Sequence, residues 1–189
     1  DKEKVDACRG LALIATEKAV APLAALLGDE KLSHMARYAL ETINNPAVDE
    51  ALRDAIGKLK GMPLVGVIGS VGVRRDARAV EALAKMLRDS DAVVAWAAAR
   101  ALGDIGNSAA ARALQNELGN VSGQNKLHVC EGLFRCAETA VAEGRKQQAI
   151  DIYDQLRKLD EPHQARGGAV RGAILARGSE GTALIREYL

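Results

Sequence analysis

The sequence predicts an all-α fold, a right-handed superhelix of about six stacked helix pairs that forms one continuous array over residues 1–189. Two observations lead to this prediction. A short motif recurs along the chain, in which two large aliphatic residues are separated by small or polar ones and are often followed by Gly or Asn. A second series of aliphatic residues recurs between copies of the motif. A period of roughly 30–40 residues built from helical segments is typical of helix-pair solenoids.

The motif is clearest where Leu102 and Ile105 enclose Gly103 and Asp104 and are followed by Gly106. Its copies begin at Leu11, Leu40, Ile68, Leu102, Leu133 and Ile174, in steps of 29, 28, 34, 31 and 41 residues. The second series is Leu23, Leu52, Leu83, Leu114, Ile152 and Leu184, in steps of 29, 31, 31, 38 and 32 residues. Because two independent series share one spacing, we expect each repeat to contain two helices.

We name the helix that carries the motif the B helix and the helix that follows its turn the A helix. The B helices are expected at about 3–15, 31–44, 62–72, 92–105, 124–142 and 163–177. The A helices are expected at about 17–28, 46–59, 76–89, 108–118, 145–159 and 180–189. Pro46 suits a first helical position, Gly106 a left-handed C′ position, and Asn107 or Ser108 an N-cap. Segment 62–72 alternates in Val and could form a strand, but its register with the other B helices favours a helix.

The composition suits such an array, because hydrophobic residues make up 48% of the chain and aromatic residues only 3%. Small side chains let helix axes approach closely. The net charge of +1 argues against phosphate-driven binding of nucleic acid. No run of 18 apolar residues predicts a membrane span, so no membrane insertion is expected. Cys8, Cys130 and Cys136 have neither disulfide nor zinc-site spacing, and we expect them to be buried as small apolar residues.

The chain starts without Met, and its last residues predict a helix interrupted within a repeat. We therefore expect a fragment of a longer protein. Its localisation stays open, cytoplasmic or exported, because a signal sequence could precede the segment. Apolar residues of the last helix, Leu184, Ile185 and Leu189, would normally be covered by a following helix. Weak self-association through uncapped ends is therefore expected.

Two adjacent segments, 79–87 and 92–106, strongly resemble the short HEAT repeats related to those of bilin lyases, and this resemblance extends over about residues 5–120. Segment 124–162 is more similar to a tetratricopeptide-type unit, through Ala142, Gly144, Ala149, Tyr153, Leu156 and Pro162. Such mixed arrays resemble large bacterial HEAT-repeat proteins of unassigned role, some of them exported. The resemblance implies an interaction scaffold for a protein or peptide.

Enzymatic alternatives have little support in the residues. The chain's three His residues, His34, His128 and His163, lack the adjacent Glu with which deoxyhypusine hydroxylase, a HEAT-type enzyme, binds iron. HEAT-like DNA glycosylases use a basic groove, whereas the cluster of Arg74, Arg75 and Arg78 is interpreted here as a solvated loop. Bilin attachment would need a cleft containing groups such as His34 and Tyr38. We expect no catalytic residue, metal or cofactor, and no enzyme.

Helical register predicts where a partner would bind. In segment 92–105, aliphatic residues such as Val94 and Leu102 occupy the face that packs on A helices, and Trp96 and Arg100 occupy the opposite face. The same offsets in the other repeats give a partner-binding strip of His34, Tyr38, Met62, Trp96, Arg100 and Phe134. B helices line the concave side of right-handed solenoids, so we expect this strip to form a groove, deepened by Gly positions. Alternatively, Trp96 packs on a neighbouring B helix under Arg100, or its indole is half-exposed.

The sequence thus predicts a non-catalytic scaffold that presents a concave groove to a protein or peptide. Two alternatives stay open. The groove could belong to an enzyme or cofactor-handling protein of the bilin-lyase or DNA-glycosylase kind, with a cluster of titratable groups in it. The repeats could also only space or dock other domains of a longer chain.

Overall fold

The computed structural model describes residues 2–14, 16–160 and 162–188, and every regular element within these ranges is helical. The prediction of an all-α fold of stacked helix pairs is therefore confirmed. Contacts divide the chain into two compact units, residues 1–79 and 80–189, and the boundary falls inside the expected third A helix. Each unit is described by itself. The single continuous array and its right-handed sense stay predictions.

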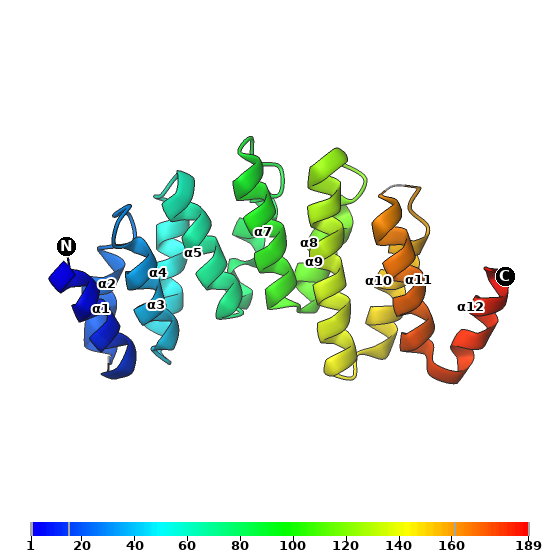
Figure 1. Cartoon of the computed structure of the whole chain (residues 1–189), viewed down its shortest axis with the longest axis horizontal. Coiled ribbons are helices and arrows are strands. Elements are labelled where there is room, and N and C mark those ends of the chain that lie inside the picture. The colour runs from blue at the N-terminus through cyan, green and yellow to red at the C-terminus, as the bar shows by residue number, and fades with distance from the viewer. Residues whose placement is uncertain (1, 15, 161, 189) are drawn as a thin grey trace. The chain divides into compact units, whose positions relative to one another are not determined.

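The described residues of unit 1 form B helices and A helices in alternation along the chain (Figure 1). Its elements are α1 (Lys2–Ile14), η1 (Glu17–Ala19), α2 (Val20–Ala24), α3 (Ser33–Thr42), α4 (Pro46–Ile56), α5 (Gly61–Val73) and η2 (Ala77–Ala79). The B helix α3 contacts both α1 and α5, while the A helix α2 contacts α3 and α4. The segment with alternating Val residues is the helix α5, so the register argument was correct. The expected A helix at 17–28 is shorter, because η1 and a turn replace its two ends.

Unit 2 has the same two layers. Its elements are α6 (Val80–Met86), α7 (Ala92–Ile105), α8 (Ser108–Glu117), α9 (Gly123–Ala142), α10 (Lys146–Arg157), α11 (His163–Arg177), η3 (Gly178–Glu180) and α12 (Gly181–Glu187). The long B helix α9 lies between α7 and α11 and contacts both, while α8 and α10 cover its other side. The wall formed by α7, α9 and α11 is thus continuous within this unit.

The recurring aliphatic residues form the core of both units. The first residues of the motif in the four central copies, Leu40, Ile68, Leu102 and Leu133, are completely buried. The first residues of the first and last copies, Leu11 and Ile174, are only partly buried. All six residues of the second series are buried, including Leu184. Ile185 is partly exposed and Leu189 lies outside the described residues, so self-association through the ends stays a prediction.

Local signals fix the turns between paired helices. Asn45 accepts a hydrogen bond from the backbone N–H of Ala47 at 2.8 Å, with Pro46 at the first helical position of α4. Asn107 caps α8 in the same way, through the N–H of Ala110 at 2.8 Å. Gly106 has φ of +64°, as expected of a left-handed C′ residue. These caps satisfy backbone donors that a helix leaves unpaired at its start.

The basic cluster after α5 is partly structural, which corrects its interpretation as a solvated loop. Only 11% of the Arg74 side chain is exposed, and it pairs with Asp49 on α4. Its guanidinium also donates to the carbonyl oxygens of Ile43 at 2.9 Å and Asn45 at 3.3 Å. A guanidinium carries five donors in a fixed fork, so one side chain can satisfy several carbonyls of a turn. The Arg78 side chain, in contrast, is exposed.

Candidate partner-binding groove

Unit 2 brings three of the predicted binding residues together. Trp96 and Arg100 on α7 and Phe134 on α9 line one hollow of about 490 Å³. Its remaining lining residues all come from α9, namely His128, Glu131, Arg135 and Glu138. The side chains share a wall because α7 and α9 pack side by side as neighbouring B helices.

Trp96 is half-buried in this hollow. Its ring meets the ring of His128 edge to face, with centroids 6.4 Å apart and planes at 87°. The guanidinium carbon of Arg100 lies 5.7 Å from the centre of the same ring, within the range of a cation–π contact. Trp96 is therefore neither a core residue nor a freely rotating surface residue. Its indole is held in place while part of it stays open to solvent.

A second hollow of about 480 Å³ adjoins the first, because Phe134 and Glu138 line both. Its walls are mainly apolar and come from α9, α10 and α11. They include Val141 and Leu175, whose exposed fractions are 50% and 66%. The rings of Phe134 and Tyr153 lie 6.1 Å apart at its base. We call the two hollows together the α9 groove, lined by Trp96, Arg100, His128, Glu131, Phe134, Arg135, Glu138, Val141, Tyr153, Gly168, Arg171, Gly172, Leu175 and Ala176.

Charges along the α9 groove are unequally paired. Arg135 donates to Asp104 at 2.9 Å, and Arg100 lies 3.9 Å from the same carboxylate. Glu131 and Glu138 form no hydrogen bond or ion pair within the described parts of the chain. They are seven residues apart, so both lie on the groove face of α9, two turns from each other. Their carboxylates are therefore available to a partner.

Glycines on the B helices allow neighbouring groups to approach closely. The sequence predicts that these positions deepen the groove, but most of them do not. A Cβ atom at Gly103 would lie 3.0 Å from the Cα of Gly132, so this pair lets α7 approach α9. A Cβ atom at Gly168 would lie 3.2 Å from the Phe134 ring, and one at Gly172 would overlap Tyr153. Neighbouring backbone or aromatic rings fill the space that each glycine leaves.

The other three predicted residues lie in unit 1. His34 and Tyr38 are exposed on α3, and Met62 is exposed on α5. None of them lines one of these hollows. Their membership of the same strip as Trp96 therefore stays a prediction.

A polar network lies beneath these residues in unit 1. Arg37 donates to the carbonyl of Gly66 at 3.2 Å and to Ser70 Oγ at 3.4 Å. The Ser70 hydroxyl donates to the Glu41 carboxylate at 2.6 Å. Burial lowers the pKa of the Arg37 guanidinium, against the opposing effect of Glu41. Ser70 itself is completely buried, so the network joins α3 to α5 and has a structural role.

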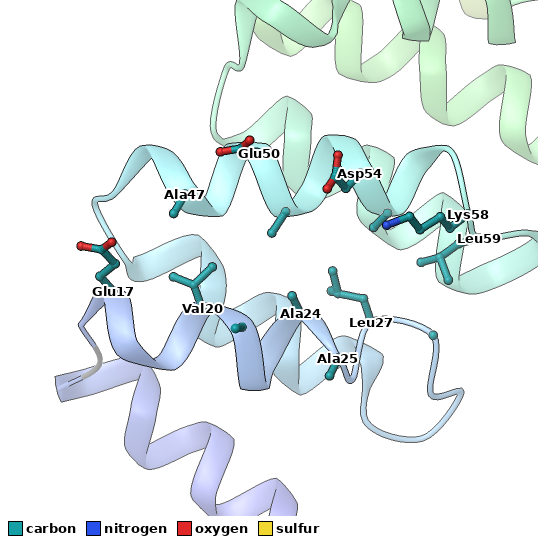
Figure 2. Close-up of a pocket in the computed structure, with 14 residues that line it drawn as sticks. Glu17, Val20, Ala24, Ala25, Leu27, Ala47, Glu50, Asp54, Lys58 and Leu59 are labelled. Atoms are coloured by element: carbon teal, nitrogen blue, oxygen red, sulfur yellow. The ribbon is translucent and has the colours of Figure 1, made fainter.

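A third hollow of about 770 Å³, larger than the two of the α9 groove, lies on the A-helix side of unit 1, between α2 and α4 (Figure 2). It is lined chiefly by alanines, namely Ala21, Ala24, Ala25, Ala47, Ala51 and Ala55. Figure 2 shows Leu27 beneath α4, with Glu50 and Asp54 along that helix. This hollow was not predicted from the sequence, because the predicted binding strip lies on B helices only. The repeated spacing of Ala47, Ala51 and Ala55 along one face of α4 was the available signal.

Side chains of the kinds that bind metal ions are not clustered in the regions that the structure describes. No three His, Cys, Asp or Glu side chains there lie where they could hold a metal ion. The absence of enzymatic activity stays a prediction. A separate finding is that no helix among the described residues has the length and apolar character needed to cross a bilayer.

Comparison with known proteins identifies the repeats. Residues 65–122 match the family model for HEAT repeats. No curated protein matches the chain. The bilin-lyase and tetratricopeptide resemblances therefore stay predictions. The match covers the central part of the chain, so segment 65–122 is similar to HEAT repeats, and the described helices of both units pair in the same way.

Proposed function

We propose that the chain is a non-catalytic scaffold that binds a protein or peptide segment in the α9 groove. HEAT repeats generally mediate protein–protein interaction. The observation that carries the proposal is the partly exposed Trp96, held between His128 and Arg100 beside Phe134. Tryptophan and arginine are enriched among the residues that dominate binding energy at interfaces.

The packing of Trp96 also favours binding on entropic grounds. Ordering a flexible side chain at an interface costs roughly 0.5–1.5 kcal/mol. The contacts of Trp96 with His128 and Arg100 meet part of this cost before a partner arrives. The buried alanines of α7, among them Ala97, Ala98 and Ala101, hold the backbone of the helix against its neighbours. A partner would therefore meet a wall that is largely preformed.

Nucleic acid is a poor candidate for this groove. Phosphate binding depends on an excess of Lys and Arg at the contact surface. In the α9 groove the Arg side chains stand beside the unpaired carboxylates of Glu131 and Glu138. We expect weak, salt-sensitive binding of duplex DNA at most.

The test is the variant Trp96→Ala, measured against a partner identified by affinity capture and mass spectrometry. We expect binding to weaken by about 2 kcal/mol or more, as at other central aromatic anchors. The free energy of unfolding should fall by less than the ~3–5 kcal/mol typical of truncating a core aromatic residue. Calorimetric titration and urea unfolding give the two quantities.

Val93→Ala is the matched control, because Val93 is exposed on the same helix and lines neither hollow of the α9 groove. It should leave both quantities nearly unchanged. A folded Trp96→Ala variant that binds the partner as tightly as the original chain would refute the groove.

A further inference from the structure

The two hollows of the α9 groove differ in the charges that they offer to a partner. Arg100 and Arg135 both neighbour Asp104, and Arg100 also stacks over Trp96. Among the described residues, the charged side chains without a partner in the first hollow are therefore the carboxylates Glu131 and Glu138. Arg171 faces only the second hollow, together with the exposed apolar side chains of Val141 and Leu175.

We infer that the groove selects a segment with a lysine or arginine followed or preceded by a large apolar side chain. The cation would enter the first hollow, where Glu131 and Glu138 flank Phe134, and the apolar side chain would cover Val141 and Leu175 in the second. This inference rests on the proposed function and names the chemical class of its partner.

Electrostatic complementarity supports this choice of partner. A segment that covered Glu131 and Glu138 without supplying a cation would desolvate two carboxylates and leave them unpaired, which is costly. A lysine or arginine turns this cost into charge-assisted hydrogen bonds. Phe134, which lies between Glu131 and Glu138 along α9 and lines the same hollow, adds an aromatic surface that attracts cations.

The position of the carboxylates also suits a long basic side chain. Seven residues of α-helix span about 10 Å, so Glu131 and Glu138 are that far apart along the wall of the first hollow. Lys and Arg carry three or four methylene groups that can lie along an aromatic ring while the charged head reaches a carboxylate. An acidic segment would meet the same two carboxylates as repulsive neighbours, so the groove would discriminate against it.

Trp96 supplies the readout, because it is the only tryptophan in the chain and lines the first hollow. The probes are two pools of synthetic dodecapeptides without Trp or Tyr. One pool combines Leu, Val and Phe with Lys and Arg, and the other combines them with Asp and Glu. Each pool is titrated into the purified chain while the emission of Trp96 is followed.

The variant pair Glu131→Gln and Glu138→Gln removes both charges and keeps the size of the side chains. Its matched control, Glu50→Gln with Asp54→Asn, removes two carboxylates from the rim of the α2–α4 hollow. We expect the basic pool to bind at least tenfold more tightly than the acidic pool. The first pair of substitutions should weaken binding of the basic pool at least tenfold. The control pair should weaken it less than twofold.

Provided that a peptide changes the emission of Trp96, three results would contradict the inference without contradicting the proposed scaffold function. These are equal or tighter binding of the acidic pool, unchanged binding of the basic pool after Glu131→Gln with Glu138→Gln, and a loss as large in the control pair. If neither pool changes the emission of Trp96, the inference and the proposed groove are both wrong.

Discussion

Contacts between single residues explain why α5 contains glycine where a helix former would be expected. A Cβ atom at Gly66 would lie 2.6 Å from the Cζ and Nε atoms of Arg37. The guanidinium lies against α5 at Gly66 and donates to the Gly66 carbonyl and to Ser70. Gly69, three residues later on the same helix, has no such neighbour within 4 Å. The two positions therefore differ although the sequence around them looks alike.

Gly66→Ala should destabilise unit 1 by about 1–3 kcal/mol, because it displaces Arg37 and leaves a partly buried charge without its acceptors. Gly69→Ala is the control and should stabilise the chain by up to about 1 kcal/mol, since alanine favours a helix interior over glycine. Urea unfolding of both variants measures the difference. Equal effects of the same sign would contradict the account of Arg37.

At the scale of elements, an arginine after a B helix repeatedly binds the turn of the preceding repeat. Arg74 follows α5 and donates to carbonyls of the α3–α4 turn. Arg145 follows α9 and donates to the carbonyl of Gly106, in the α7–α8 turn, at 3.0 Å. Each joins consecutive repeats through backbone groups that a helix end leaves unpaired. These contacts complement the apolar packing between repeats.

Arg74→Lys tests this contact, because lysine keeps the charge and loses the fork that reaches Ile43, Asn45 and Asp49 together. We expect a loss of about 1–3 kcal/mol in the free energy of unfolding. Arg78→Lys, at an exposed position in the same cluster, should change it by less than about 0.5 kcal/mol. Thermal and urea unfolding compare the free energies of unfolding of the two variants. If Arg74→Lys leaves this free energy unchanged, the contacts with the carbonyl groups do not stabilise the chain.

The pattern of helices could be predicted from the sequence because each signal is local. Leu40 and Leu102 begin copies of the recurring motif and are buried, while Asn45 and Gly106 mark turns by their own conformational preferences. The role of Arg74 could not be predicted, since its acceptors lie in the preceding repeat, 29 to 31 residues away along the chain. Contacts between repeats depend on how the helices are placed, which periodicity does not specify.

The same distinction holds for the candidate site. Helical register correctly puts Trp96 beside Arg100, because residues four apart are neighbours on one helix. The meeting of Trp96 with His128 and the second hollow beyond Phe134 depend on how α7, α9 and α11 pack. The alanine-lined hollow between α2 and α4 results from small side chains on two helices, and neither helix reveals it alone.

For the whole molecule, the division into two compact units raises the question of whether the units unfold together or separately. In helix-pair arrays each repeat contacts only its neighbours, so stability is approximately the sum of repeat and interface terms. Unit 1 and unit 2 could therefore open together, as the predicted continuous array requires, or separately. Each unit contains at least one buried free cysteine, Cys8 in the first and Cys130 with Cys136 in the second.

Because these thiols are buried, the rate at which each is alkylated reports how often its unit opens. Burial raises the pKa of Cys130 to about 11 and that of Cys136 to about 12, so at pH 8 almost none of these two thiols is present as the reactive thiolate while unit 2 is folded. We expect alkylation of Cys130 and Cys136 at one shared rate, set by the opening of unit 2. Mass spectrometry over a urea series compares this rate with that of Cys8. Identical rates would show that the two units open as one cooperative array, and different rates would show that they open separately. Rapid alkylation of Cys136 in the native chain would contradict its burial. The cysteines that the sequence predicts only as core residues thus allow the cooperativity of the array to be measured without introducing a label into the chain.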